Sequence, residues 1–392
     1  MKSQNTKLPK PKKPLRMRLS ESIEDIAQSM GRAYAALLIR HWRRQAEHNR
    51  SRFAKKYIAI VGSCGKSTTT MLTGKLLGAQ VAVRLGVFNN TERDCYRMLR
   101  RLDLHVDFAV QEVTEFPVGT IAKVMRATRP DCGVITSAGL DHLTEFRSNG
   151  AVAAELATLS RDCPIICLNA DDANVRALAA TAKGRVVTFG TNAGADVRAE
   201  NVSSQLPGRL HFDLVIEGVK RPVQTRFAGT LMLTNLLGAL AVVHAQGLDL
   251  DRAIQTLAET DPARGRLSVH EGLCQHTIIL DTVKAPLWST RLLVDDLKNM
   301  GAGRRVFVLG GLSDTGSGGS SARYRQVMKA ATAECDLVIG MAGAASTASK
   351  LAGQHGTSRI MSAGTLAEVA ELLLRDALDH GQRHRPPRLR PA

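Results

Sequence analysis

Apolar and polar positions change their spacing in a regular way from Tyr57 onward. Five short runs are rich in apolar residues, as in strands buried on both faces; they cover residues 57–62, 107–112, 132–137, 164–168 and 185–189. Stretches with helical spacing separate these runs, near residues 66–78, 91–101, 118–127, 150–160 and 172–181. Apolar strands joined by helical crossovers are typical of a parallel sheet covered by helices on both faces. The pattern therefore predicts an α/β fold.

Two further patterns divide the rest of the chain. Residues 195–227 include a period-two alternation (LHFDLVIEG), which predicts a small antiparallel addition that helices near 230–246 and 250–259 close. A second alternation of strands and helices follows, with strands at 277–281, 305–310 and 336–340 and helices near 288–299, 320–333 and 365–378. Residues 261–266 (DPARGR) lie between the patterns and predict a linker. We therefore predict a central domain over residues 57–262 and a smaller α/β domain over residues 263–380.

The two ends of the chain differ from these domains. Residues 1–19 are rich in Lys and Pro and are expected to be disordered, as are residues 381–392. Ser20 is a candidate N-cap for a helix that ends near Arg52, with one apolar stripe and arginines crowded at its end. This helix either packs on the first domain, where arginines suit its C-terminus, or lies on an anionic lipid surface. Residues 1–56 thus form a basic tail and an amphipathic helix.

Charge is concentrated at the same two ends. The chain of 392 residues carries a formal net charge of +17, of which residues 1–56 contribute +11 and residues 381–392 contribute +4. A nearly neutral body argues against nucleic acid as a partner and leaves an anionic membrane surface or polymer as a candidate for the termini. Hydrophobic residues make up 44% and charged residues 23%, which is ordinary for a globular protein.

The location is predicted from three observations. No run of 18 uncharged apolar residues is present, and the basic N-terminus lacks the apolar stretch of a secretory signal. The seven cysteines are scattered, and the closest pair, Cys163 and Cys167, does not have zinc-site spacing. These features favour a reduced, cytoplasmic protein, with a peripheral position at the inner face of the membrane as the alternative.

The segment YIAIVGSCGKSTTT carries the strongest chemical signal. A buried strand leads into a glycine-rich turn, which Lys66, Ser67 and a helix follow. Gly62 and Gly65 allow backbone N–H groups to approach phosphate oxygens, and the helix N-terminus favours an anion. Lys66 would neutralise the β- and γ-phosphates, and the Ser67 hydroxyl would bind Mg²⁺. The segment therefore predicts binding of ATP and Mg²⁺.

This loop has the form GxxGKSTTT, because Ile60 stands where the Walker pattern has its first glycine. It resembles the loop of the Mur ligase family, which includes peptidoglycan amino-acid ligases and the folylpolyglutamate, cyanophycin and polyglutamate synthetases. Further similar segments follow in order: FNNT at 88–91, Glu112 with Gly119 and Ile121, RPDCGVITSAGLDHLTEF at 129–146, LNADD at 168–172, Asn235, Gly265-Arg266, and Asp281 with Ala285 and Ser289. The central and C-terminal parts look most like the MurF branch, and the short N-terminus is similar to the polyglutamate synthetase branch.

The resemblance implies a P-loop parallel-sheet ATP-binding domain and a smaller Rossmann-like C-terminal domain. It also implies roles for single residues. ATP would be bound by Gly62, Ser63, Cys64, Gly65, Lys66, Ser67, Thr68, Asn235, Arg266 and Asp281. Mg²⁺ would be held by Ser67, Glu112 and His142, and the catalytic residues would be Lys66, Glu112 and His142.

Without the motif, Glu112 is an ordinary strand-end carboxylate and His142 a capping histidine. Arg266 and Asp281 would likewise be a surface ion pair or turn residues. With the motif, closure of the two domains would assemble the site. The implied reaction has three steps: ATP phosphorylates a carboxylate, an amine attacks the acyl phosphate, and an amide forms with release of ADP and phosphate.

Four features of the sequence depart from the family pattern. Leu156 stands where peptidoglycan ligases carry a carbamoylated lysine, and Glu155 is the nearest residue able to supply a replacement anion. About 56 residues precede the predicted ATP-binding domain, too few for a UDP-sugar-binding domain. TERDCYRML follows Asn90 where a Gly-x-Pro turn is usual, and DTVKAPLWS at 281–289 places Lys284 at an asparagine position. We therefore expect a carboxylate acceptor other than the UDP-linked tripeptide, in cell-wall or cell-surface polymer biosynthesis.

Three function classes remain open. The first is an ATP-dependent amide ligase that joins an amine or amino acid to a carboxylate acceptor. The second is a P-loop NTPase that acts as a switch or motor, although no GTPase-type base-reading motif is present. The third is a divergent, catalytically reduced nucleotide-binding protein that serves as a scaffold. ADP release that depends on an added amine separates the first class from the second, and binding without turnover identifies the third.

Overall fold

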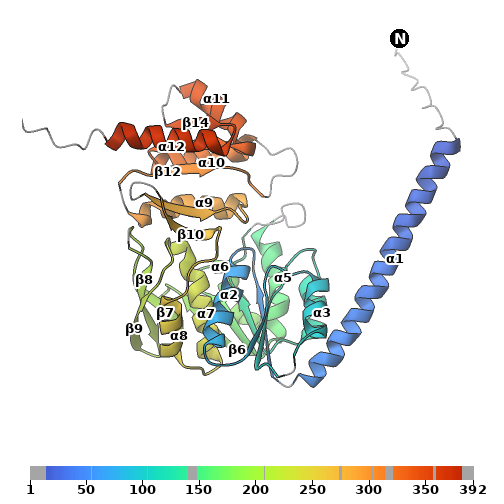
Figure 1. Ribbon diagram of the computed structural model, residues 1–392. Coiled ribbons are helices and arrows are strands. Elements are labelled where there is room, and N and C mark those ends of the chain that lie inside the picture. The colour runs from blue at the N-terminus through green and yellow to red at the C-terminus, as the bar shows by residue number, and fades with distance from the viewer. Residues whose placement is uncertain are drawn as a thin grey trace, which may run out of the picture.

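A nine-stranded sheet forms the centre of the molecule in a computed structural model (Figure 1). The structure describes residues 15–53, 55–103, 105–139, 148–206, 208–272, 276–301, 303–313, 321–355 and 359–381. The strands are β1 (Lys56–Val61), β2 (Val83–Gly86), β3 (Phe108–Glu112), β4 (Cys132–Ile135), β5 (Ile165–Asn169), β6 (Arg185–Gly190), β7 (Val197–Ser203), β8 (His211–Ile216) and β9 (Val219–Gln224). Their order is β2-β3-β1-β4-β5-β6-β7-β8-β9, and all neighbours are parallel except β7–β8 and β8–β9.

This sheet confirms the predicted α/β class and the five predicted strands. The strand β2 escaped prediction because it is short and lies at the sheet edge, where most of its side chains are partly exposed. The predicted antiparallel addition exists, but its strands extend the main sheet through β7 and do not form a separate sheet.

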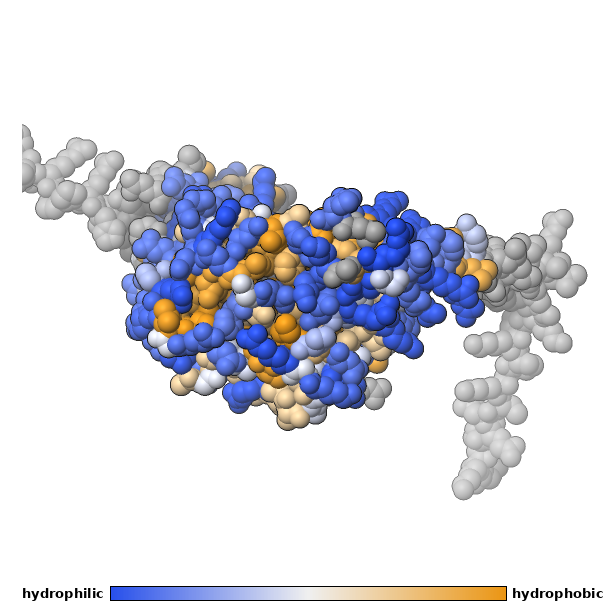
Figure 2. All heavy atoms as spheres, turned by 90° about the horizontal axis from the view of Figure 1, so that it is seen from below, coloured by the Kyte–Doolittle hydropathy of each residue, from blue (hydrophilic) through white to orange (hydrophobic). Residues whose placement is uncertain are grey.

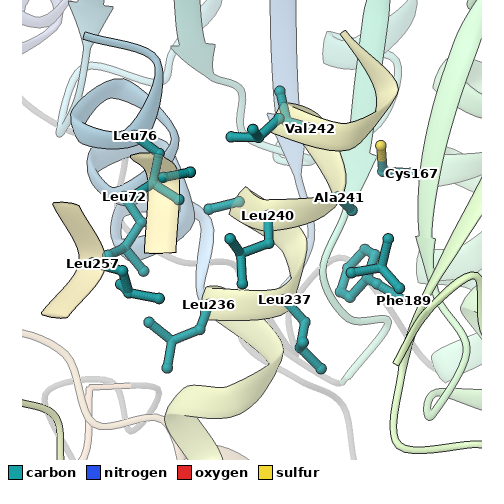
Figure 3. Packing of buried hydrophobic residues seen from close by; sticks show 14 of the residues in the cluster. Leu72, Leu76, Cys167, Phe189, Leu236, Leu237, Leu240, Ala241, Val242 and Leu257 are labelled. Carbon is teal, nitrogen blue, oxygen red and sulfur yellow. The ribbon is translucent and has the colours of Figure 1, made fainter. Parts of the chain in front are cut away.

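Helices cover both faces of the sheet. One face packs against α2 (Lys66–Gly78), α7 (Leu233–Ala245) and α8 (Leu250–Ala258), where Leu76, Leu240 and Leu257 are fully buried. Figure 3 shows these leucines meeting between the helices, with Phe189 of β6 on the sheet side. The other face packs against α3 (Glu92–Arg100), α4 (Thr120–Thr128) and α5 (Asn149–Asp162). Each fully buried leucine contributes about 1.5–3 kcal/mol through removal of apolar surface from water.

Smaller elements complete the central part of the fold. They are α6 (Ala173–Arg176) and the 3₁₀ turns η1 (Ala177–Thr181) and η2 (Thr230–Met232). The predicted helix at 172–181 is therefore split, because its second half tightens into 3₁₀ geometry.

The N-terminal helix α1 (Leu15–Arg52) is anchored by its C-terminal end. Asn49 donates hydrogen bonds to the Leu99 and Arg100 carbonyls at the end of α3, and Ala46 is fully buried. Trp42 lies beneath three arginine side chains of α3, at 4.8–5.5 Å from ring centroid to guanidinium carbon. The remainder of α1 projects from the body (Figure 1). Packing on the first domain is thus confirmed for this end of the helix.

The helix begins earlier than expected. Residues 15–19 are helical, so the prediction of disorder is wrong for them, while residues 1–14 lie outside the described part of the chain. Leu, Met and Arg at these positions favour helix, whereas the prolines precede them. Within the described residues, we find no helix with the length and apolar character needed to cross a membrane.

The C-terminal part contains two small sheets. One is the antiparallel pair β10 (Arg266–Glu271) and β11 (Thr277–Asp281), and the other is a parallel sheet of β12 (Val306–Leu309), β13 (Leu337–Met341) and β14 (Ile360–Ala363). The helices of the C-terminal part are α9 (Leu287–Asp296), α10 (Ser321–Glu334), α11 (Ala345–His355) and α12 (Leu366–Gly381), with 3₁₀ turns η4 (Leu297–Met300) and η5 (Ala342–Ala344).

Three predictions for the C-terminal part are corrected by the structure. Arg266 starts a strand and is not in the linker, residues 277–281 pair with β10 and not with the parallel sheet, and Gly381 ends a helix. Residues 382–392 lie outside the description, and the domain boundaries stay predictions.

Candidate nucleotide-binding site

The glycine-rich loop connects the end of β1 to the start of α2 under tight steric limits. Gly62 and Gly65 have φ angles of 132° and 84°, which residues with a side chain rarely adopt. A Cβ atom on Gly62 would lie 2.3 Å from the Thr136 hydroxyl, and one on Gly65 would lie 2.1 Å from the Asn235 amide oxygen. The loop therefore requires both glycines, and it brings Asn235 of α7 against the start of α2.

Hydrogen bonds fasten the loop to the segment after β4. The Ser63 and Cys64 amides donate to the Ser137 carbonyl and hydroxyl at 3.1 and 3.0 Å, and the Ser63 hydroxyl donates to the Gly139 carbonyl at 2.6 Å. This segment is braced in turn, because the Asn169 amide donates to the Thr136 carbonyl and Asp172 accepts from a backbone amide. The LNADD motif thus supports the segment that holds the loop through Asn169 and Asp172.

The first turn of α2 places Lys66, Ser67 and Thr68 at the mouth of the loop. No side chain caps this helix, so its N-terminal amides keep their capacity to bind an anion. Lys66 is 8% exposed and donates to the Gly62 carbonyl and to Glu115, with 2.8 Å between Nζ and Oε2. Thr69, one turn further, donates to the Asn235 amide oxygen at 3.1 Å. The geometry is that of a phosphate-binding loop.

Glu112 is the last residue of β3 and is fully buried. Neither of its carboxylate oxygens has a partner at normal hydrogen-bond geometry among the residues described, although the Ser67 hydroxyl and the Phe88 amide lie near enough to act on it. Burial raises the pKa of this carboxyl above its ordinary value, while the nearby Ser67 hydroxyl, Lys66, Phe88 backbone and Arg266 oppose the shift. Buried oxygens left without partners beside a serine hydroxyl are suited to a hard cation such as Mg²⁺. The residues present therefore fit a magnesium ion.

His142, the other predicted metal ligand, lies outside the described residues, so its role stays a prediction. The described parts of the chain contain no group of three or more His, Cys, Asp and Glu side chains arranged to hold a metal.

The helix α5 does not supply an additional anion. Leu156 is fully buried in the hydrophobic core beneath α4 and α5. The Glu155 carboxylate accepts hydrogen bonds from the Gly119 and Ile121 amides at 3.0–3.2 Å, at the start of α4. A carboxylate at a helix N-terminus is stabilised by these amides and by the helix dipole. Glu155 is engaged as a cap, which argues against its expected use as a replacement anion.

Arg266 and Asp281 reach the loop from the C-terminal part. They face each other across β10 and β11, and the Arg266 guanidinium lies 6.0 Å from the Phe88 ring centroid. Burial raises the pKa of Asp281, and Arg266 opposes that shift. Burial also raises the pKa of the Cys64 thiol, and Lys66, Asp281, Arg266 and Lys284 all lie near enough to influence it. The structure thus brings these predicted residues together with the loop.

The same interface has contacts that the sequence did not indicate. Trp288 of α9 packs so closely on Gly139 that a Cβ there would lie 2.7 Å from the indole ring. The Arg266 guanidinium lies over the Phe88 ring, and Glu115 forms an ion pair with Lys66. Phe88 lies in the FNNT segment and Glu115 lies three residues after Glu112. Their positions beside recognised motifs were the available signal, but neither has a motif of its own.

These features define the P-loop class of α/β proteins. Residues 60–243 match the family model of the Mur ligase middle domain. The predicted resemblance is therefore confirmed for the central domain.

Relatives and solved structures extend the comparison. The chain is 31% identical over 218 residues to UDP-N-acetylmuramoyl-tripeptide--D-alanyl-D-alanine ligase of Mycobacterium tuberculosis (strain ATCC 25618 / H37Rv); the match covers 54% of this chain and 42% of that protein. The chain thus spans less than half the length of this relative.

Its fold is similar to MurF from Acinetobacter baumannii, with a TM-score of 0.75, 23% identity, and coverage of 86% of this chain and 74% of that one. It is also similar to folylpolyglutamate synthase from Mycobacterium tuberculosis complexed with ADP and AMPPCP, with a TM-score of 0.65, 17% identity, and coverage of 83% and 86%. The predicted two-part architecture agrees with these folds.

Proposed function

We propose that this protein is an ATP-dependent, ADP-forming amide ligase that joins an amine or amino acid to a carboxylate acceptor. The observation that carries the proposal is the meeting of Lys66, Glu112 and Arg266 at one loop between the central and C-terminal parts. A simple phosphate-binding switch has no need for a basic residue from a second α/β unit beside the loop. The match of residues 60–243 to the Mur ligase middle domain supports the same activity, in cell-wall or cell-surface polymer biosynthesis.

In this proposal the loop amides and Lys66 bind the phosphates, and Ser67, Glu112 and His142 hold Mg²⁺. ATP would supply the phosphoryl group that activates the acceptor carboxylate toward an amine. Lys66 and Arg266 provide positive charge where charge spreads over the phosphoryl oxygens. Trp288, packed on Gly139, restricts access of water from the side of α9. The chain's own residues thus position the reactants and stabilise charge.

A cavity beside Asn235 is suited to the nucleoside. Its volume is about 470 Å³, within the usual range for small-molecule sites, and its lining includes Asp171, Thr230, Thr234 and Asn299. Thr234 precedes Asn235, which contacts the phosphate loop through Thr69. We place the base and ribose of ATP there, because a nucleotide whose phosphates occupy the loop needs a polar hollow close by.

The deciding experiment measures ADP release by the purified full-length chain with ATP, Mg²⁺, candidate carboxylates and a panel of amines. D-Alanyl-D-alanine is tested first, because the Mycobacterium relative is named for it. A ligase releases ADP only when both acceptor and amine are present, and the product contains a new amide by mass spectrometry. ADP release without an amine supports the switch or motor. Nucleotide binding without turnover under every combination supports the catalytically reduced scaffold.

We also propose that the basic N-terminal arm contacts an anionic membrane or polymer. Tyr34 and Leu37 of α1 are 66% and 64% exposed, close to the exposed Arg40 and Arg44. In Figure 2 hydrophilic residues dominate this arm, and apolar side chains are exposed near its described end. Apolar and basic residues together favour binding to an anionic interface.

Vesicle flotation tests this second proposal. Full-length protein should float with vesicles containing anionic lipid at low salt, and less with neutral vesicles or at high salt. Removal of residues 1–19 and 381–392 should weaken flotation without loss of nucleotide turnover. Undiminished flotation of the truncated chain would show that these segments do not anchor it.

A further inference from the structure

Glu115 is a buried carboxylate beside the loop lysine that the proposed reaction has not yet used. It follows β3 by three residues and is 1% exposed. Its Oε2 atom lies 2.8 Å from Lys66 Nζ, and its Oε1 atom has no hydrogen-bond partner in the described structure. Both side chains of this pair are withdrawn from water, at 9% and 1% exposure.

The pair places two opposing demands on one ammonium group. An ammonium buried without a counter-charge is strongly destabilising, so Glu115 stabilises the nucleotide-free loop. Phosphates entering the loop need the same positive charge, and they meet the negative charge of Glu115 at short range. Attraction and repulsion of this kind are weakly screened where water is excluded, so both are stronger here than at the protein surface.

We infer that Glu115 is a positioning residue that holds the Lys66 ammonium in the nucleotide-free loop and competes with the nucleotide phosphates for it. The inference rests on the proposed binding of a nucleotide by this loop. Its consequence is that Glu115 lowers the affinity for both ATP and ADP, and so speeds release of the product. Glu112 has a different place in the site, because it lies near Ser67 and has no ion-pair partner among the described residues.

The test is the substitution Glu115→Gln, which keeps the shape and one accepting oxygen but removes the charge. Calorimetric titration with ADP at saturating Mg²⁺ should give a dissociation constant at least about fivefold lower than that of the unmodified protein. ADP should also raise the melting temperature of the variant by more than that of the unmodified protein. A purely structural role for Glu115 would change stability but leave the dissociation constant unchanged.

Asp131→Asn serves as the matched control. Asp131 pairs with Arg50 at 2.7 Å and accepts from the Tyr57 amide, away from the loop, so its loss should lower the melting temperature without changing ADP affinity. If Glu115→Gln does not fold, Glu115→Asp replaces it, because it draws the carboxylate back by one methylene. That variant should bind ADP more tightly than the unmodified protein.

Unchanged or weaker ADP binding in a folded Glu115 variant overturns the inference, and weaker binding would instead mark Glu115 as a metal ligand. Failure of the unmodified protein and of Asp131→Asn to bind any ADP overturns the proposed function itself. The two failures are therefore distinguishable.

Discussion

Glu112 at the end of β3 and Glu155 on α5 are both buried glutamates, with exposed fractions of 0% and 8%. Glu155 accepts from two backbone amides at the start of α4, so its charge is compensated within the fold. Glu112 has two oxygens without partners among the described residues, and burial raises its pKa. One region uses a carboxylate to join two helices, and the other keeps a carboxylate at a cost to stability.

The difference separates a structural acid from a candidate ligand. Folded proteins leave few buried polar atoms unsatisfied, because each such atom costs about 1–3 kcal/mol. Glu112 bears this cost beside the phosphate-binding loop. Its lack of partners is explained by a cation that binds there together with the nucleotide. Five predictions test this difference and the site around Glu112.

The largest effect is expected from Lys66→Ala. Removal of the ammonium deprives the phosphates of a charge-assisted partner, so nucleotide turnover should be abolished while the fold persists. The measurement is ADP release together with a circular dichroism melt. Lys75→Ala, an exposed position on the same helix, is the matched control and should retain turnover. Unchanged turnover in folded Lys66→Ala would sink the phosphate-loop assignment.

Glu112→Gln should lower the turnover rate by orders of magnitude and raise the Mg²⁺ concentration needed, as for a lost metal ligand. It should also stabilise the protein at neutral pH. A carboxyl group whose pKa is higher in the folded than in the unfolded state stabilises the fold most at pH values below its ordinary pKa. This stabilisation is lost as the pH rises through the raised pKa of the folded state. The variant should therefore melt at a higher temperature than the unmodified protein at pH 7, and the difference should vanish near pH 4. A lower melting temperature at pH 7 with normal Mg²⁺ dependence would make Glu112 structural.

Glu155→Gln should show the reverse behaviour. Loss of the charged cap on α4 should cost about 1–3 kcal/mol of stability, measured by chemical unfolding, while the Mg²⁺ requirement stays as it was. A large change in Mg²⁺ dependence in Glu155→Gln with little loss of stability would remove the contrast between the two glutamates.

His142→Ala, by contrast, should raise the Mg²⁺ requirement and lower the rate if that residue holds the metal.

The smallest effect concerns bicarbonate. Since Leu156 lies in the core, α5 has no lysine there to carbamoylate, and turnover should be the same in CO₂-free buffer and with added bicarbonate. Stirring under argon before the assay removes the dissolved gas. Strong stimulation by bicarbonate would show that a lysine from another segment enters the site.

The local sequence was sufficient to predict most of the central fold. The apolar runs that became β1, β3, β4, β5 and β6 carry their signal within about six residues, because a strand buried on both faces is mostly apolar. The edge strand β2 and the pair β10–β11 were harder to assign. Their side chains are partly exposed, so the hydrophobic pattern is weak and the pairing partner is distant in sequence.

The glycines of the phosphate loop and Lys66 were readable from the chain alone, because the backbone geometry of such a loop depends on residue types at fixed spacing. The sequence alone did not show which carboxylate is left without hydrogen-bond partners. Glu112, Glu115 and Glu155 have the same side chain, and only the packed structure decides that Glu155 accepts from backbone amides, Glu115 pairs with Lys66, and Glu112 is buried beside Ser67 without an ion-pair partner among the described residues. The physical reason is that hydrogen bonding and charge compensation inside a protein depend on groups brought together from distant segments, whereas the local backbone pattern depends on neighbours in sequence.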